Sequence, residues 1–142
     1  MWELGGASAP FFIYLCLKSN AMKTLAVYGT LKGGYGNHYL LQDSEFVGEG
    51  KTVEKYRMCI SGVPFVIRGA HIDGNHIDVE VYNVADDDVL SVDMLEGHPT
   101  WYRRERIPIK LESGVVKMCW LYFADERYDD GIYYSNYGLK GR

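Results

Sequence analysis

The sequence predicts a single α+β domain whose sheet curls into a barrel or half-barrel. About six short segments have the pattern of strands, and only two short segments have the pattern of helices. Within the 142 residues there is no internal repeat and no Pro/Ser-rich linker, and the 47% apolar content is sufficient for one core. Short strands joined by tight turns favour a sheet that closes on itself.

The first strand leads into a glycine-rich loop and a short helix. Residues 24–28 form a compact apolar run, which is typical of a buried strand. Residues 29–37 contain four glycines and are interpreted as a loop. Asn37 belongs to the residue types that cap helices, and it predicts a short helix through about residue 43.

The middle of the chain predicts further strands. Residues 51–58 and 59–67 have strand character, with a break at 61–64. Residues 70–73 and 76–84 predict a hairpin that turns at Gly74 and Asn75. The second strand of this hairpin alternates, with apolar residues on one face at Ile77, Val79 and Val81.

The clearest helix runs from residue 86 to residue 96. Val89, Val92 and Leu95 recur every three residues, which predicts one apolar face. Three aspartates occupy the first turn, where the helix dipole favours negative charge, and Gly97 is a natural stop. Residues 104–111 and 115–123 then predict a strand pair around a turn at 112–114, and the tail from residue 125 has no clear pattern.

Residues 1–21 differ from the rest of the chain. We expect them to form an N-terminal extension outside a core domain of residues 22–142, because Met22 resembles an ordinary start and a strand follows at once. Residues 9–17 are apolar but too few to cross a bilayer. A signal peptide would require positive charge near its start, but no Lys or Arg precedes Lys18. The alternatives are an extra edge strand or a tail that packs on a partner chain.

Charge and cysteine content narrow the function classes. The formal net charge of −4 provides no basic surface, which argues against a nucleic-acid partner, and no segment argues for a membrane. Cys16, Cys59 and Cys119 are widely spaced and odd in number, which fits neither a disulfide framework nor a CxxC motif. This pattern predicts a reducing, cytoplasmic setting. Cys59 and Cys119 lie in apolar runs, where a buried thiol is inert. The sequence does not indicate an oligomeric state.

The loop at residues 28–34 is the first candidate site. Gly29 follows a buried strand and permits a sharp turn, after which successive backbone N–H groups can converge on an anion. The segment matches neither GxxxxGK[ST] nor GxGxxG, so a small anion such as a carboxylate suits it best. The alternative is a plain turn that uses glycine for its positive φ.

Glu96 is the second candidate. It lies four residues after Val92 and seven after Val89, so it projects from the apolar face of the helix. It also lies in the last turn, where the helix dipole disfavours negative charge. Burial and the dipole would both raise its pKa, which suits a group that takes and returns a proton near neutral pH. The alternative is a carboxylate paired with Arg103, Arg104 or Arg106.

The third candidate combines two histidines and two aspartates between residues 71 and 78. His71 and Asp73 share one face of the first strand of the predicted hairpin, and His76 and Asp78 share one face of the second. Exposed hairpins often carry such polar residues, and no third cluster completes a tetrahedral ligand set. We therefore predict no metal site here. The sequence also lacks a Gly-x-Ser-x-Gly elbow, which argues against a serine hydrolase.

Taken together, these segments resemble the gamma-glutamylcyclotransferase superfamily, in the branch of gamma-glutamylamine cyclotransferase and the AIG2-like proteins. The resemblance extends from about residue 24 to residue 123 and rests on motifs in the order of the family. These motifs are Val27-Tyr28-Gly29-Thr30-Leu31-Lys32 with Asn37, then Glu80-Val81-Tyr82, and then residues 92–104, which read VDMLEGHPTWYRR.

The resemblance implies a small mixed barrel with two flanking helices and a reaction that needs no cofactor. In that reaction the α-amine of a gamma-glutamyl substrate attacks its own γ-carbonyl, which releases 5-oxoproline and an amine. Glu96 would be the acid/base, and we add the hypothesis that Tyr102 helps to orient Glu96 or the substrate. One departure is Val79, where the family usually has glycine. The residues that would hold the substrate carboxylate are Tyr28, Gly29, Thr30 and Leu31.

Three functions are therefore in competition. The first is a cyclotransferase acting on gamma-glutamyl amines such as gamma-glutamyl-ε-lysine, or on gamma-glutamyl dipeptides or another gamma-glutamyl metabolite. The second is a non-catalytic AIG2-like module that binds a small molecule. The third is a metal-dependent hydrolase that uses His71 and His76. The position of Glu96 on the apolar face favours the first.

Overall fold

The computed structural model describes residues 21–138, so the expected extension lies, apart from Ala21, outside the described residues. Seven strands, one α-helix and two short 3-10 helices make up this part of the chain. Among these residues, no helix is long and apolar enough to span a membrane. The elements are β2 (Met22–Val27), η1 (His38–Leu41), β3 (Glu45–Thr52), β4 (Met58–Ser61), β5 (Val63–Ile67), β6 (Asp78–Ala85), α2 (Asp86–Glu96), β7 (Tyr102–Leu111), β8 (Val116–Ala124) and η2 (Glu126–Tyr128).

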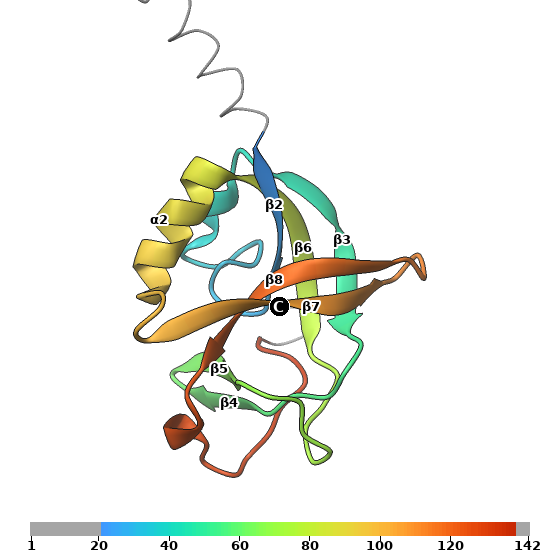
Figure 1. Cartoon of the computed structure of the whole chain (residues 1–142), viewed down its shortest axis with the longest axis vertical. Coiled ribbons are helices and arrows are strands. Elements are labelled where there is room, and N and C mark those ends of the chain that lie inside the picture. Colours follow the sequence, from blue (N-terminus) through green and yellow to red (C-terminus); the bar gives the residue numbers. More distant parts are fainter. Residues whose placement is uncertain (1–20, 139–142) are drawn as a thin grey trace, which may run out of the picture.

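Five of the strands close into a barrel, which confirms the predicted fold class. The strand order is β2-β6-β3-β7-β8-β5-β4, and β2 also pairs with β8 in parallel at Leu25 and Trp120. That extra pairing closes β2, β6, β3, β7 and β8 into a ring, while the β4–β5 hairpin extends the sheet from the end of β8. Figure 1 shows α2 along one side of the barrel and β4 and β5 at its far end. Both parallel and antiparallel pairs occur, so the barrel is mixed.

The strand β2 has apolar residues on both faces because it separates two parts of the core. Ala26, together with Tyr28 just past the strand, packs inside the barrel with residues of β6, β7 and β8. Leu25 and Val27 point the other way, into a second cluster with Val89 and Val92 of α2 and with η1. A strand buried on both faces reads as a continuous apolar run. This explains the compact pattern of residues 24–28.

The helix α2 has the predicted bounds, but its buried face differs from the expected one. Val89 and Val92 are buried, whereas Leu95 is 44% exposed. Asp93 is buried in its place, so the inward face is Val89, Val92, Asp93 and the partly buried Glu96. This spacing of i, i+3, i+4 and i+7 is that of one helix face.

Three sequence-based predictions of local structure were wrong. Residues 70–73 form no strand, because Gly74 and Asn75 lie against Tyr56: the backbones of Tyr56 and Asn75 exchange two hydrogen bonds of 2.9 Å. A Cβ at Gly74 would lie 2.3 Å from the Tyr56 carbonyl oxygen, so glycine permits this close approach rather than a hairpin turn. The strand expected at 51–58 is β3, which ends at Thr52. Asn37 makes no capping hydrogen bond, and η1 is a single 3-10 turn.

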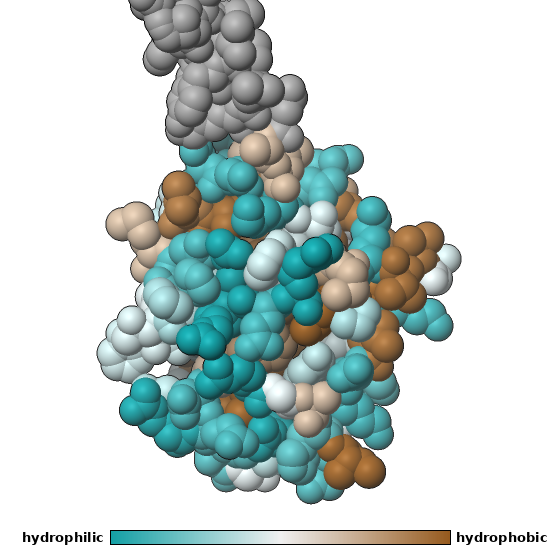
Figure 2. Space-filling view, viewed as in Figure 1, coloured by the Kyte–Doolittle hydropathy of each residue, from teal (hydrophilic) through white to brown (hydrophobic). Residues whose placement is uncertain are grey.

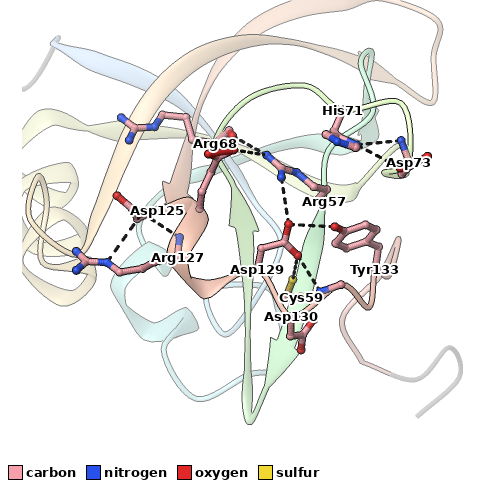
Figure 3. A network of polar contacts seen from close by, with 12 residues as sticks. Arg57, Cys59, Arg68, His71, Asp73, Asp125, Arg127, Asp129, Asp130 and Tyr133 are labelled. Carbon is pink, nitrogen blue, oxygen red and sulfur yellow. Dashed lines mark hydrogen bonds and ion pairs between the residues drawn. The ribbon is translucent and has the colours of Figure 1, made fainter.

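The segment after β8 is held against β4 by a buried arginine. Arg57 donates to Asp129 at 3.1 Å, to the Arg68 carbonyl at 3.2 Å and to Glu126 at 3.4 Å. Asp129 also accepts the hydroxyl of Tyr133 at 3.0 Å, and Figure 3 shows these groups converging. Because a buried cation must be paired, this network fixes the course of the tail that had no clear sequence pattern.

The face of the molecule seen in Figure 2 is largely hydrophilic. Hydrophobic residues gather on it at the tip of the β7–β8 hairpin, where Val115 and Val116 are about half exposed. Scattered exposed apolar residues are normal on a folded domain.

Candidate active site

A cavity of about 620 Å³ opens where the end of β2, the C-terminal end of α2 and the starts of β5 and β7 meet. Its walls come from the loop after β2, from the start of β5 and from the turn between α2 and β7. Ala26, Val27 and Asn37 also line it. The cavity brings together all six residues that the sequence nominated for a site: Tyr28, Gly29, Thr30, Leu31, Glu96 and Tyr102.

The loop after β2 lines this cavity and contains unused backbone donors. Within residues 21–138, no hydrogen bond uses the N–H of Gly29, Thr30 or Leu31. The loop is fixed from behind, because Lys32 N–H donates to the Gly29 carbonyl at 3.0 Å and Asn37 donates twice to Thr30, at 3.0 Å to its carbonyl and at 2.8 Å to its hydroxyl. Fixed, unpaired N–H groups in sequence form a binding place for an anion.

Position 29 requires glycine because there is no room for a side chain. Gly29 is not among the glycines with positive φ, so the plain-turn alternative does not explain it. Instead, a Cβ at this position would lie 2.8 Å from Cγ of Pro64, which is too close. The loop and the first residues of β5 therefore pack directly against each other in the wall of the cavity.

Gly29→Ala is expected to push the loop away from Pro64 and to raise KM for a substrate by about tenfold, because an orienting hydrogen bond contributes about 1–1.5 kcal/mol. The control is Gly36→Ala in the same loop, where φ is not positive and nothing lies within 4 Å of the added methyl group. Equal KM values for the two variants would contradict this role of the loop.

The side chains of Tyr28 and Leu31 are engaged in the core, so these two residues contribute mainly backbone groups to the cavity. The Tyr28 hydroxyl donates to the Tyr122 carbonyl at 2.9 Å and accepts from Val66 N–H at 3.3 Å. Burial raises the pKa of this hydroxyl well above its usual value, so it stays neutral. Leu31 is buried in the cluster between β2 and α2. Both side chains thus anchor the loop in the core.

Glu96 is a partly buried carboxyl group without a partner. Burial, and secondly the negative charge of Asp93, raise the pKa of Glu96 to about 7. The structure does not support the alternative of an arginine pair, since no ion pair or hydrogen bond within the described residues involves the Glu96 carboxylate. Glu96 lies at the end of α2, which Gly97 terminates in the left-handed conformation. A group with this pKa can exchange a proton at neutral pH.

Asp93, rather than Glu96, forms the ion pair with a nearby arginine. Arg104 donates to both carboxylate oxygens of Asp93, at 2.9 and 3.2 Å, and the Tyr122 hydroxyl donates to the same carboxylate. Burial alone would raise the pKa of Asp93, but the hydrogen bonds from Arg104 and Tyr122 bring it below its ordinary value. Asp93 therefore stays charged one helical turn before Glu96 and opposes the ionisation of that residue.

Tyr102 lies at the start of β7 and lines the same cavity. Its hydroxyl donates to the Pro64 carbonyl at 3.4 Å. Burial, followed by the charge of Glu96, raises the pKa of Tyr102 to about 12, so this hydroxyl is protonated at neutral pH. The sequence patterns did not predict that the site would also include Asn37, Pro64, Asp93, Trp101 and Tyr122. The contributions of Pro64, Asp93 and Tyr122 depend on contacts between segments far apart in the chain, whereas Asn37 contacts Thr30 and Trp101 contacts Gly97, which are near in sequence.

The described residues contain one group that could bring three metal ligands together, and it does not include the histidines and aspartates of residues 71–78. Ligand atoms of Cys59, Asp129 and Asp130 lie within 4.8 Å of one another. The Asp129 carboxylate, however, already accepts from Arg57, Tyr133 and Gly131, and the nearby guanidinium disfavours a cation. His76 lies 3.0 Å from the Thr52 carbonyl, and His71 accepts from Asp73 N–H at 3.1 Å. Neither histidine belongs to a three-ligand group within residues 21–138.

Comparisons with known proteins identify the family of this chain. The model of the family "Gamma-glutamyl cyclotransferase, AIG2-like" matches residues 25–138. A Methanocaldococcus jannaschii protein, provisionally named a gamma-glutamylcyclotransferase, is 43% identical over 106 residues, which cover 74% of this chain and 87% of that protein. Human gamma-glutamylaminecyclotransferase is 32% identical over 100 residues, or 63% of each chain, so this chain spans less than two thirds of the human protein.

The fold is similar to that of a solved relative as well. The crystal structure of a mouse AIG2-like protein superimposes with a TM-score of 0.76 and 26% sequence identity, covering 86% of this chain and 92% of that one. The match of the family model extends from β2 through the loop, Glu96 and Tyr102 to the tail held by Arg57. The chain belongs to the AIG2-like gamma-glutamyl cyclotransferase family.

Proposed function

We propose that this chain is a cyclotransferase that releases 5-oxoproline and a free amine from gamma-glutamyl amines or peptides, with Glu96 as general acid/base. The observation that carries the proposal is the unpaired Glu96 carboxyl, with its pKa raised to about 7, in one cavity with the free N–H groups of Gly29, Thr30 and Leu31. The names of relatives such as human gamma-glutamylaminecyclotransferase support this class of activity.

The loop holds the substrate and Glu96 moves the proton. The carboxylate of the gamma-glutamyl group accepts hydrogen bonds from the free N–H groups, which leaves its α-ammonium within reach of Glu96. Glu96 removes a proton, and the neutral amine attacks the γ-carbonyl of the same molecule to form the new C–N bond. The bond to the leaving nitrogen then breaks as Glu96 returns the proton to that nitrogen. The ring nitrogen releases its second proton as the lactam forms, and the departing amine takes up a proton, so that the products are 5-oxoproline and an ammonium ion. Holding the folded-back substrate contributes much of the rate by proximity.

The test is the release of 5-oxoproline by the full chain from gamma-glutamyl-ε-lysine and from a set of gamma-glutamyl dipeptides. Release identifies a cyclotransferase, and the preferred substrate distinguishes the amine branch from the dipeptide branch. A folded protein that binds these compounds without releasing 5-oxoproline would instead be a non-catalytic binding module.

Tyr102→Phe is expected to lower kcat/KM about three- to tenfold, because the hydroxyl that bridges toward Pro64 would no longer orient Glu96 or the substrate. Tyr39→Phe is the matched control, since Tyr39 is exposed on η1 and outside the cavity. An unchanged rate for Tyr102→Phe would remove Tyr102 from the mechanism.

A further inference from the structure

The loop after β2 takes part in two cavities. Residues 29–31 line the first cavity, which holds Glu96. Residues 32–35 line a second cavity of about 830 Å³, together with Asn136 and Tyr137 of the C-terminal segment, which we define as residues 135–137. The mechanism above gives no role to the side chain of Lys32, although this residue directly follows the free N–H groups of the loop.

Lys32 connects the loop to the C-terminal segment. It is only 9% exposed, and its ammonium group donates to the Asn136 side-chain oxygen at 3.2 Å and to the Tyr137 carbonyl at 2.9 Å. A buried ammonium group needs such acceptors, because the loss of water without replacement hydrogen bonds is costly. The rings of Tyr35 and Tyr137 also pack together, with their centroids 5.5 Å apart. The loop is therefore attached to the C-terminal segment at two positions.

The C-terminal segment is itself fixed to the barrel, so it can support the loop. The Ser135 carbonyl accepts from the Asp78 N–H of β6 at 2.8 Å. Tyr137 packs against the core of the barrel, and its hydroxyl donates at 3.5 Å to the carbonyl of Gly62, between β4 and β5. The next two residues, 63–64, line the first cavity. Tyr137 thus contacts both the loop and the β4–β5 turn, which meet in the wall of that cavity.

Glu80 of β6 holds the next residue of the loop. The Gly33 N–H donates to the Glu80 carboxylate at 2.8 Å, and the Tyr82 hydroxyl donates to the same oxygen at 2.9 Å. Lys32 and Gly33 are therefore held by the C-terminal segment and by β6, respectively. Because they follow residues 29–31 directly, these restraints limit the directions in which the free N–H groups point. Such preorganisation lowers the entropic cost of binding.

We propose that the C-terminal segment holds the loop in its anion-binding conformation through Lys32, which makes Lys32 a positioning residue. This inference rests on the proposed function, in which the N–H groups of residues 29–31 bind the substrate carboxylate. Lys32 acts on these groups through the backbone, since it does not line the first cavity. Without the ammonium group the loop samples more conformations, and the binding-competent one is less populated. The apparent affinity for substrate falls by that fraction.

Lys32→Met tests the proposal, because methionine keeps most of the apolar stem and removes the ammonium group. Amide hydrogen exchange of the full chain, followed by NMR, reports on the loop itself. The N–H groups of Tyr35 and Asn37 donate within the loop, to the carbonyls of Lys32 and Thr30 at 3.1 and 3.0 Å. We expect both to exchange about tenfold faster in the variant, and by a larger factor than the amides of α2. A purely structural role would accelerate the loop and α2 alike.

The steady-state kinetics of 5-oxoproline release give a second readout. In Lys32→Met we expect KM to rise about tenfold, whereas kcat should fall by less than about threefold, because Glu96 keeps its place once substrate is bound. Asn136→Ala removes one of the two acceptors and should cause the same changes to a smaller extent. Combined with Lys32→Met it should add nothing, since both remove the same interaction.

Lys23→Met is the matched control. Lys23 is a partly buried lysine whose ammonium group lies 3.2 Å from Asp86, and it lines neither cavity. Its removal should change neither exchange in the loop nor KM.

An unchanged KM in Lys32→Met, or exchange in the loop that rises no more than exchange in α2, would overturn the proposal. Asn136→Ala decides the question by the same two readouts if Lys32→Met does not fold. A folded wild type that releases no 5-oxoproline would overturn the proposed function and the catalytic role of Lys32 with it. The exchange data would then still show whether the C-terminal segment holds the loop.

Discussion

Glu96→Gln is expected to lower kcat for 5-oxoproline release by about 10²–10⁴-fold, the range for removal of a general acid/base. Glutamine has nearly the same shape and fills the same place at the end of α2, so the substrate should still bind. It cannot take the proton from the α-ammonium, and the attacking amine then stays protonated. Single-turnover kinetics together with calorimetric binding to the variant separate these two effects.

Glu54→Gln is the matched control for this loss, since Glu54 is exposed and outside the cavity. Its kcat should equal that of the wild type. If Glu96→Gln kept more than about a tenth of the wild-type kcat, an acid/base contribution of the usual size would be absent and the mechanism would be wrong.

The same substitution should change stability in a manner that depends on pH. The pKa of Glu96 is raised in the folded state from 4.5 to about 7, so the folded protein binds more protons than the unfolded chain between these values. The contribution of Glu96 to stability therefore falls as pH rises through this window. Glu96→Gln should match the wild type near pH 4.5 and be more stable by about 1–2 kcal/mol at pH 8, as urea unfolding would show.

Asp93→Asn has the second largest expected effect, and it acts on both folding and catalysis. Arg104 would lose the carboxylate that binds it through two hydrogen bonds, which we expect to cost about 2–3 kcal/mol of unfolding free energy because both side chains are largely buried. The negative charge that raises the pKa of Glu96 would also disappear, and Arg104 would be left uncompensated beside it. Both changes lower the pKa of Glu96.

The pH profile distinguishes this positioning role from a purely structural one. Catalysis needs ionised Glu96, so kcat/KM should rise with pH through the pKa of that residue, and in Asp93→Asn the rise should move to lower pH. A structural role alone would reduce the amount of folded enzyme and leave the rise where it is. Asp88→Asn, on the same helix but outside the cavity, should do neither.

The parts of the site that follow from local patterns could be predicted from the sequence. The spacing of Val89, Val92 and Glu96 fixes which face of α2 each residue occupies, and the glycine after a buried strand marks the loop. The raised pKa of Glu96 was expected from burial on that face, and burial is its larger cause. The second cause is Asp93, whose state depends on Arg104 and on Tyr122, 29 residues away in sequence. A local pattern cannot carry that information.

The wrong predictions about the fold also result from contacts between segments that are far apart in the sequence. β3 begins at Glu45, in a segment whose glycines and acidic residues do not resemble a strand. Gly50 is required there because a Cβ would lie 2.6 Å from the Lys110 carbonyl of β7. Likewise, Asn75 pairs with Tyr56 rather than with its neighbours in sequence, which removed the predicted hairpin. In both places, packing between distant segments overrides the local propensity.

The pH dependence of kcat/KM for 5-oxoproline release by the wild-type chain tests the central claim most directly, because it reports the pKa of the essential base in the free enzyme. With gamma-glutamyl-ε-lysine or the best substrate found, the account predicts a rise with an apparent pKa of about 7, the value of Glu96. A rate that is constant between about pH 5.5 and 8.5, or a rise near the ordinary carboxyl value of about 4.3, would contradict the assignment of Glu96 as the base.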